Sequence, residues 1–556
     1  MLKKHPKGLL VAFFSNMGER FGFYTMMAIL VLFLQARYGL TEMEAGGYYS
    51  WFYFAIYALA ILGGFLADAT RKYKLVIFAG IVIMFVGYAI IAVPDLSLTI
   101  TLTGLFTIAF GNGLFKGNLQ AVVGQMYDNP KYSKVRDSAF MIFYMGINIG
   151  AFFAPFVANS IRNWFLKTQG FAHDGSLPAL CHAQIKGELG DAAVLQELAN
   201  KVDLSGIAVT NLTTFAQNYI DAFSKGYNYA FGIAACAMII SLLVYIIFNK
   251  HLPAKQKVSK AEAAADPNKM PWAQEKKRLF ALGLVFIVVI FFWMSFHQNG
   301  LTLTFFARDY TVKEVGPFTN VFFQLESILA FIACAAGFFL LLFRKPVREK
   351  IIGLAMFGGF GALTYYFVSQ NAAMNPITPE VFQSFNPLFI VALTFPVMGI
   401  FAWMRNKNIE PSTPRKIGIG MIIAAIGFVV ILVASLNLVS PYELVSADGK
   451  TLPIPDSSRV MPYWLMSSYL ILTIAELFLS PIGLSFVSKV SPPRFQGLMQ
   501  GGWLLATAIG NKLLFVGSYF WGLIDLWQLW AIFIVCCLLS AAFIFSILKR
   551  LENATK

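Results

Sequence analysis

Fourteen mostly apolar stretches, separated by polar segments, constrain the fold of this chain more than any other feature. A helix of about 20 apolar residues crosses the hydrocarbon core of a bilayer. The predicted spans are 8–36, 47–68, 75–94, 99–126, 139–163, 226–249, 279–306, 318–343, 351–370, 386–404, 417–438, 462–488, 496–522 and 525–548. With only 13% charged residues, the chain has too little polar surface for a water-soluble fold. We therefore expect an all-α membrane protein with fourteen transmembrane helices.

The basic residues predict the orientation of these helices. If the N-terminus is cytoplasmic, 30 of the 43 Lys and Arg residues fall in cytoplasmic segments, as the positive-inside rule requires. Their placement explains the net charge of +15 without any contact to nucleic acid. We expect a multi-pass protein of the lipid bilayer with both termini in the cytoplasm.

Two long polar segments divide the chain. Residues 250–276 form the longest polar connection on the cytoplasmic side, between the sixth and seventh spans. They separate an N-terminal six-helix bundle, 1–249, from a C-terminal bundle, 277–556. The segment 164–224 faces the outside, and its mixed composition predicts a small extracytoplasmic excursion with some helix. Two bundles joined by a cytoplasmic linker are typical of carriers that rock about a central site.

The sequence offers little for enzymatic chemistry. It contains no phosphate-binding loop and no nucleophile motif with a placed base, so we expect neither an enzyme nor a protein with a cofactor. The five cysteines predict no disulfide framework. Cys181, His182 and His173 have no common metal-ligand spacing, so we expect no metal site and interpret them as solvated loop residues.

Ionisable residues inside the apolar spans are the best functional candidates. Glu19 and Arg20 lie in the first span, Lys116 in the fourth, His297 in the seventh and Glu476 in the twelfth. Each Asp, Lys or Arg near a helix centre costs roughly 2.5–3.5 kcal/mol on insertion, so such residues usually serve a purpose. The alternative is a set of buried ion pairs that only fixes helix packing.

Short motifs in both halves support a family resemblance. Residues 140–152 read FMIFYMGINIGAF, residues 111–116 read GNGLFK and residues 476–483 read ELFLSPIG. Further segments are 16–24 (NMGERFGFY), 63–74 (GGFLADATRKYK), 292–298 (FWMSFHQ), 382–387 (FQSFNP) and 502–503 (GW). Over nearly its whole length the chain resembles the proton-dependent oligopeptide transporter family of the major facilitator superfamily, bacterial type. The resemblance implies proton-coupled import of di- and tripeptides across a bacterial inner membrane, by a monomer.

The resemblance also locates two additional helices. The seventh-helix motif precedes the spans 318–343 and 351–370, and the eighth-helix motif follows them. The extra hairpin, 318–370, therefore lies between family helices seven and eight. Many bacterial members carry theirs between helices six and seven, so this position is a departure. The expected architecture is a major facilitator fold with two six-helix bundles plus this hairpin.

A zwitterionic peptide requires a site with both charges, because neither of its termini sheds water without an opposite charge. Arg20 and Lys116 in the first bundle are the predicted partners of the carboxylate, and Glu476 in the second bundle is the predicted partner of the ammonium group. A bound peptide would then bridge the two bundles.

Other predicted binding residues serve the side chains and backbone of the peptide. Tyr24, Tyr57, Trp293 and Trp503 are candidates for the side-chain pockets, and their alternative is simple packing. Asn148, Gln298 and Asn386 are candidates for hydrogen bonds to the peptide backbone, and their alternative is interhelical hydrogen bonding. The predicted set also includes Ser480 of the 476–483 motif.

Proton coupling is where the chain departs most from the family pattern. Asn16 replaces the first acid of the first-helix motif, so only Glu19 of that acidic pair can exchange a proton. Met27 and His297 replace an arginine and a glutamate that form an ion pair in typical members. We expect transport to remain proton-linked through Glu19, with His297 able to titrate or to stay neutral and hydrogen-bonded. Open alternatives are a carrier of another small solute (an amino acid, nitrate or a modified peptide), a facilitator with weakened coupling, and a peptide sensor.

Overall fold

The computed structural model describes residues 5–127, 130–133, 135–253, 271–446, 448–492 and 495–555. Its first half contains α1 (Gly8–Tyr38), α2 (Glu42–Thr70), α3 (Tyr73–Ala92), α4 (Leu98–Met126), α5 (Pro130–Ser133), α6 (Arg136–Thr168), α7 (Leu177–Lys186), α8 (Ala192–Val202), α9 (Leu212–Phe248) and the turn η2 (Asn249–His251). Most of the predicted linker 250–276 lies outside the described residues.

The second half begins with α11 (Trp272–Phe296), η3 (His297–Gly300), α12 (Thr302–Asp309), β1 (Glu314–Val315), α13 (Pro317–Asn320), α14 (Leu325–Phe343), α15 (Val347–Gln370), β2 (Asn375–Pro376) and η4 (Pro379–Ser384). It continues with α16 (Phe385–Asn406), α17 (Thr413–Ser435), η5 (Pro441–Leu444), η6 (Asp456–Ser458), α18 (Tyr463–Val490), α19 (Gln496–Lys512), α20 (Phe515–Phe520), α21 (Leu526–Ser546) and α22 (Leu548–Thr555).

The predicted number of transmembrane helices is not confirmed. Among the described residues, thirteen helices, not fourteen, are long and apolar enough to cross a membrane. The difference is the predicted span 496–522, which the structure divides into α19 and α20. At the break, Gln298 Nε2 donates a hydrogen bond to the Leu514 carbonyl at 3.2 Å, and a side chain inserted in this way interrupts the helical ladder. Together α19 and α20 still cover the predicted span.

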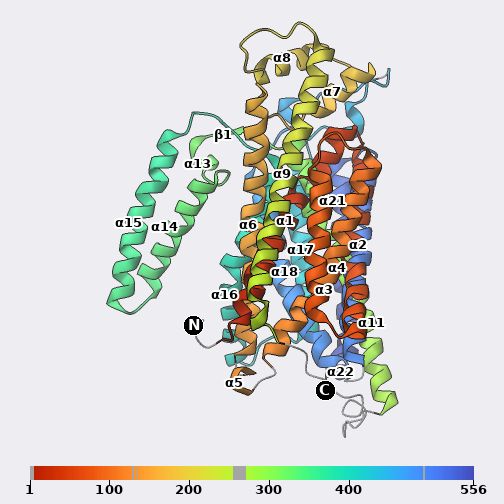
Figure 1. The fold of residues 1–556 in the computed structure, drawn as a ribbon, viewed down its shortest axis with the longest axis vertical. Helices are drawn as coiled ribbons and strands as arrows, with labels where there is room; N and C mark the ends of the chain where they lie inside the picture. Colours follow the sequence, from red (N-terminus) through yellow and green to blue (C-terminus); the bar gives the residue numbers. More distant parts are fainter. Residues whose placement is uncertain are drawn as a thin grey trace.

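Figure 1 shows the long helices running side by side, with both termini at one end of the molecule and α7 and α8 at the other. We call these ends the termini side and the loop side. In the first half, α1 packs against α6 and α9, and α4 packs against α2 and α3. Between the halves, α2 contacts α19 and α20, and α6 contacts α16.

Glycines allow the helices around α4 to approach closely. A Cβ atom on Gly63 of α2 would lie 2.1 Å from the Gly113 carbonyl oxygen, and one on Gly80 of α3 would lie 2.8 Å from the Gly111 carbonyl oxygen. Larger residues would therefore force these helices apart, as expected where small residues drive packing in lipid.

The segment between α6 and α9 folds over the loop side. These two helices extend into the predicted excursion 164–224 and leave 169–211 between them, including α7 and α8. Cys181 on α7 is fully buried, so its prediction as a solvated residue is wrong. The reason is that α7 packs its apolar face onto α9.

The same segment also binds the second half. The Thr451 N–H donates to the Glu188 carbonyl at 2.8 Å, and the Gly190 N–H donates to the Thr451 carbonyl at 2.9 Å. Lys313 forms an ion pair of 2.6 Å with Asp174. The loop side therefore joins the halves through both main-chain and charged contacts.

The hairpin of α14 and α15 stands apart from the other helices (Figure 1). Its helices pack on each other, where Gly337 and Gly353 allow close approach. The antiparallel pair β1–β2 closes its base. Near that base, the Thr319 hydroxyl lies 2.6 Å from the Tyr463 hydroxyl of α18, and the Phe323 ring contacts the Phe382 ring at 5.1 Å. The hairpin is thus anchored at its loop-side end.

Candidate functional site

A cavity of about 1720 Å³ lies between the two halves. It reaches the termini side, where Asp68 and Tyr73 of the first half face Arg405, Glu410 and Lys489 of the second half. At the loop side the described helices contact each other across the halves. The cavity is therefore open toward the end that carries both termini.

Glu19 and Arg20 of α1 form a buried ion pair in the wall of this cavity. Arg20 Nε lies 2.5 Å from Glu19 Oε2, and Asn112 Nδ2 of α4 donates to Glu19 Oε1 at 2.6 Å. Arg20 lines the cavity, whereas Glu19 lies behind it among helices of the first half. In this arrangement the carboxylate of Glu19 neutralises the charge of Arg20, the next residue in the chain.

Lys116 of α4 is the other cation in the first half. Its Nζ lies 4.0 Å above the centre of the Tyr57 ring, a cation–π contact with α2. No described carboxylate pairs with Lys116. A positive charge thus faces the cavity with only an aromatic ring as partner.

Glu476 of α18 supplies the opposite charge from the second half. Asn386 Nδ2 of α16 donates to Glu476 Oε2 at 2.9 Å and also lies 3.0 Å from the Thr473 hydroxyl. These contacts orient the carboxylate while it stays at the cavity surface. Positive charge on one half and negative charge on the other define a bipolar cavity.

Most predicted site residues meet in this one cavity. Its lining contains Arg20, Tyr24, Tyr57, Lys116, Asn148, Trp293, His297, Asn386, Glu476, Ser480 and Trp503. Glu19 and Gln298 do not line it. Gln298 is fully buried and bonds to Met294, Leu514 and Thr302, which is the interhelical hydrogen bonding considered as its alternative.

His297 lies at the contact between the halves. Its ring stacks on Trp293 of α11 and makes a tilted contact with the ring of Tyr53 of α2, and the centroid distance is 4.6 Å in both cases. Its Nδ1 lies 2.5 Å from Asn511 Oδ1. Met27, which replaces the arginine of the family pattern, also lines the cavity. At this position, therefore, a contact between the rings of Tyr53 and His297 joins the halves.

The sequence did not predict the ion pairs that Arg162 and Arg308 form between the halves at the loop side. Arg162 of α6 pairs with Glu380 of η4, and Arg308 of α12 pairs with Glu42 of α2 at 2.9 Å. All four residues fell at the edges of predicted spans or in loops, where charges are common. Their isolated positions gave no sign that they pair across the halves.

A helical membrane protein with two halves around a central charged cavity, open at one end, defines the class of alternating-access carriers. The sequence model of the POT family matches residues 74–182 and 362–521. This match in both halves, together with the relatives described below, supports membership of the POT family. Its family and relatives are transporters, which are not enzymes.

Curated relatives match over most of the chain. The peptide transporter YePEPT of Yersinia enterocolitica is 28% identical over 539 residues, which cover 91% of this chain and 86% of the relative. Dipeptide and tripeptide permease A of Escherichia coli is 25% identical over 535 residues, which cover 94% of this chain and 85% of the relative.

Solved structures share the fold. A peptide transporter POT mutant in complex with alafosfalin has a TM-score of 0.65 at 23% identity, covering 99% of this chain and 96% of that chain. A POT family transporter in complex with 5-aminolevulinic acid has a TM-score of 0.64 at 20% identity, covering 99% and 97%. These matches support the major facilitator arrangement of the helices.

Proposed function

We propose that this protein is a proton-coupled symporter that imports di- and tripeptides by alternating access. The observation that carries the proposal is the bipolar cavity, with Lys116 and Arg20 on one half and Glu476 on the other. The names of the curated relatives, peptide transporter and dipeptide and tripeptide permease, support this substrate class.

In the proposed complex the peptide connects the two halves. Lys116 and Arg20 bind its carboxylate, and Glu476, oriented by Asn386, binds its ammonium group. Trp293 and Trp503 provide apolar surface for side chains of varied size, and Asn148, which lines the cavity, reaches the peptide backbone. Because a bound peptide attracts both halves, it favours closure of the cavity around it.

Glu19 is the proposed site of proton coupling. Its carboxylate holds Arg20, so a proton on Glu19 would release the guanidinium to bind the peptide carboxylate. Loss of that proton would restore the internal pair and expel the carboxylate. Substrate and proton would then bind together.

The proposed topology follows from the charges and the cavity. The termini side, with its basic loops, is cytoplasmic, so the structure represents the inward-open state. The protein is proposed to act as a monomer in a bacterial inner membrane, with 1–249 and 277–556 as its two moving bundles and 318–370 as an added hairpin.

A second candidate is the carriage of another small solute, such as an amino acid, nitrate or a modified peptide. Structural relatives bound to 5-aminolevulinic acid and to alafosfalin favour this alternative. A facilitator with weakened coupling is a further version of it, because Met27 and His297 form no ion pair between the halves.

The test is uptake into proteoliposomes that contain the purified protein. We expect a labelled dipeptide to accumulate only when the outside is acidic, and unlabelled di- and tripeptides to compete while free amino acids and nitrate do not. Competition by nitrate or an amino acid alone would favour the second candidate. Uptake that ignores the proton gradient would favour facilitated exchange.

A further inference from the structure

The contact between Arg162 and Glu380 is the most buried ion pair between the two halves. Both side chains are fully buried, and the pair joins α6 of the first half to η4 of the second. The Tyr227 hydroxyl of α9 donates to the same carboxylate oxygen at 3.1 Å. Because the pair lies at the closed loop side, the two halves cannot separate there unless it breaks.

Breaking this pair while both groups are charged would be costly. An uncompensated charge would remain on each half, in a region shielded from water. Neutralising one partner removes this obstacle, and a carboxylate can be neutralised by a proton, whereas a guanidinium keeps its charge. Glu380 is therefore the partner that can release the contact.

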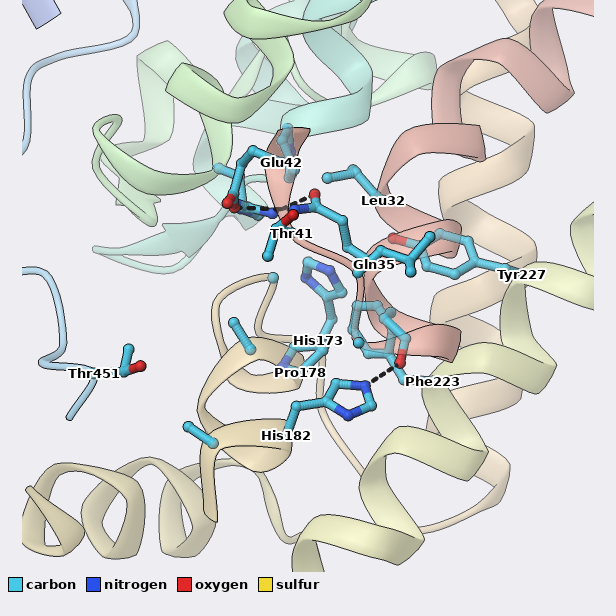
Figure 2. A pocket seen from close by; sticks show the side chains of 18 of the residues that line it. Leu32, Gln35, Thr41, Glu42, His173, Pro178, His182, Phe223, Tyr227 and Thr451 are labelled. Carbon is cyan, nitrogen blue, oxygen red and sulfur yellow. Dashed lines mark hydrogen bonds and ion pairs between the residues drawn. The ribbon is translucent and has the colours of Figure 1, made fainter. Parts of the chain in front are cut away.

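A pocket of about 270 Å³ connects Glu380 with the surface of the loop side. Figure 2 shows this pocket, with Tyr227 and Glu42 among its labelled lining residues. The lining also includes the exposed Lys186 and Glu188 and the buried Glu380. Glu380 Oε2 has no hydrogen-bond partner within the described part of the chain. One oxygen of the carboxylate is thus free to take a proton.

We propose that Glu380 is the proton-sensitive gate residue of the loop side: a proton that enters through this pocket binds Glu380, releases Arg162 and permits outward opening. The inference rests on the proposed function, because it assigns the loop side to the side from which peptide and proton enter. When the loop side closes again, Glu380 returns the proton through the pocket, and the ion pair forms again.

Other charged groups around Glu380 do not replace it. On α12, Arg308 is held by Asp309 at 2.6 Å and by Glu42 at 2.9 Å. On α1, Arg37 is held by Asp95 at 3.0 Å. The part of α16 next to η4 carries no ionisable side chain, since its nearest is Arg405 near the far end.

His173 also lines the pocket, but it is a poor proton acceptor. Burial, together with the positive charge of Arg162, holds the pKa of His173 well below its ordinary value of 6.5. The ring therefore stays neutral at the mildly acidic pH of an imposed gradient. His173 is therefore not an alternative to Glu380 as the proton acceptor of this pair.

The test uses spin labels on the loop side of each half, at Thr99→Cys on α4 and Asn437→Cys after α17. Cys236, Cys334 and Cys536 are replaced by alanine, while Cys181 and Cys537 are buried and react little. Pulsed electron-spin resonance then measures the distance between the labels in nanodiscs without peptide. For the parent protein we expect short distances at pH 7.5 and a long-distance population that grows at pH 5.

In Glu380→Gln, which imitates the protonated acid, the long-distance population should be present at both pH values. The double variant Arg162→Gln with Glu380→Gln leaves no unpaired charge, and it should also lose the pH response. The matched control is Asp221→Asn, which removes an exposed ion pair with Lys225 inside α9. It should behave like the parent protein.

The proposal is overturned if Glu380→Gln follows the parent distribution at both pH values, or if Asp221→Asn reproduces the effect. It is also overturned if the double variant keeps a full pH response. Because the measurement contains no peptide, a failure of peptide uptake would count against the proposed function alone and would leave the gate result standing.

Discussion

Glu476 shows how one side chain can determine which solutes the cavity accepts. It is the acid that the second half presents to the centre of the cavity, and Asn386 orients it. In Glu476→Gln, the amide keeps the shape but loses the charge that attracts an ammonium group. A hydrogen bond to a charged group contributes roughly 1.5–3 kcal/mol, so affinity for dipeptides should fall about 10- to 100-fold.

The measurement for Glu476→Gln is equilibrium binding of a dipeptide and of its N-acetylated analogue. The analogue lacks the ammonium group and should bind more weakly than the dipeptide. Its affinity should be nearly the same for Glu476→Gln as for the parent protein. An equal loss of affinity for both compounds would remove Glu476 from the ammonium site.

Asp174 provides a prediction on pH and stability at the loop side. Burial opposes its ionisation, but Lys313 and hydrogen bonds from Ser176 outweigh burial and lower the pKa of Asp174 to about 2. A depressed pKa means that the stabilisation is present above the ordinary value of 3.8 and is lost as pH falls through about 2. Asp174→Asn should therefore lower Tm by the same amount at pH 5 and pH 8. A smaller difference in Tm between the parent protein and Asp174→Asn at pH 5 than at pH 8 would show that Asp174 titrates near pH 5.

At the scale of single residues, sequence motifs predicted the residues that line the cavity better than the contacts that close its loop side. Lys116 and Glu476 could be predicted because a charge inside an apolar span is rare and costly. Arg162 and Glu380 could not, because charges at span ends are common and only the folded chain brings these two together. Gln298 was misplaced because spacing alone does not separate a residue facing a cavity from one facing a neighbouring helix.

The α14–α15 hairpin is the element with the least contact to the transporter body. Apart from its anchored base, it packs on itself, and its other surfaces are exposed in the described structure. Replacing residues 325–370 by a short Gly/Ser linker keeps the anchor at Thr319 and Phe323. Peptide uptake per folded protein should then stay within about twofold of the parent, because α14 and α15 do not line the cavity.

Uptake by the hairpin deletion is measured in proteoliposomes at matched protein content. The control is binding of a dipeptide in detergent, which reports an intact cavity. Intact binding combined with lost uptake would show that the hairpin takes part in the movement of the second half.

Element boundaries were predictable where apolar length alone decides them. They failed where a tertiary contact interrupts a helix, as at Leu514, whose carbonyl accepts a hydrogen bond from Gln298. The pattern of apolar residues continues across this break, so the sequence predicted one span where the structure has α19 and α20. The long α9 shows the opposite case, since it extends beyond the predicted span into a packed segment at the loop side.

For the whole molecule, the open cavity predicts one-sided access in the resting state. Gly501 of α19 lines the cavity, and a Cβ atom there would meet no neighbour within 4 Å, so Gly501→Cys should fold normally. With the other accessible cysteines removed, a membrane-impermeant thiol reagent should label this residue in inside-out vesicles. Labelling in right-side-out cells should be slow, and an acidic medium with dipeptide should accelerate it. Equal labelling from both sides would contradict an inward-open resting state.

The overall arrangement was predictable because lipid restricts the chain to transmembrane helices and the motifs fix their order. The sequence could not predict which end of the cavity is open, because that depends on a balance of contacts between the halves. The ion pair of Arg308 with Glu42 and the ring contact of His297 with Tyr53 contribute to this balance, and neither contact could be predicted from spacing.

The main-chain hydrogen bonds between residues 188–190 and Thr451 suggest a route to inhibition that never involves the cavity. They bring the exposed Glu188 of the first half beside the exposed Lys450 of the second half. An antibody fragment that recognises this composite epitope would hold the halves together at the loop side. Because it would not compete with substrate, such an inhibitor would lower the maximal rate of transport at every peptide concentration.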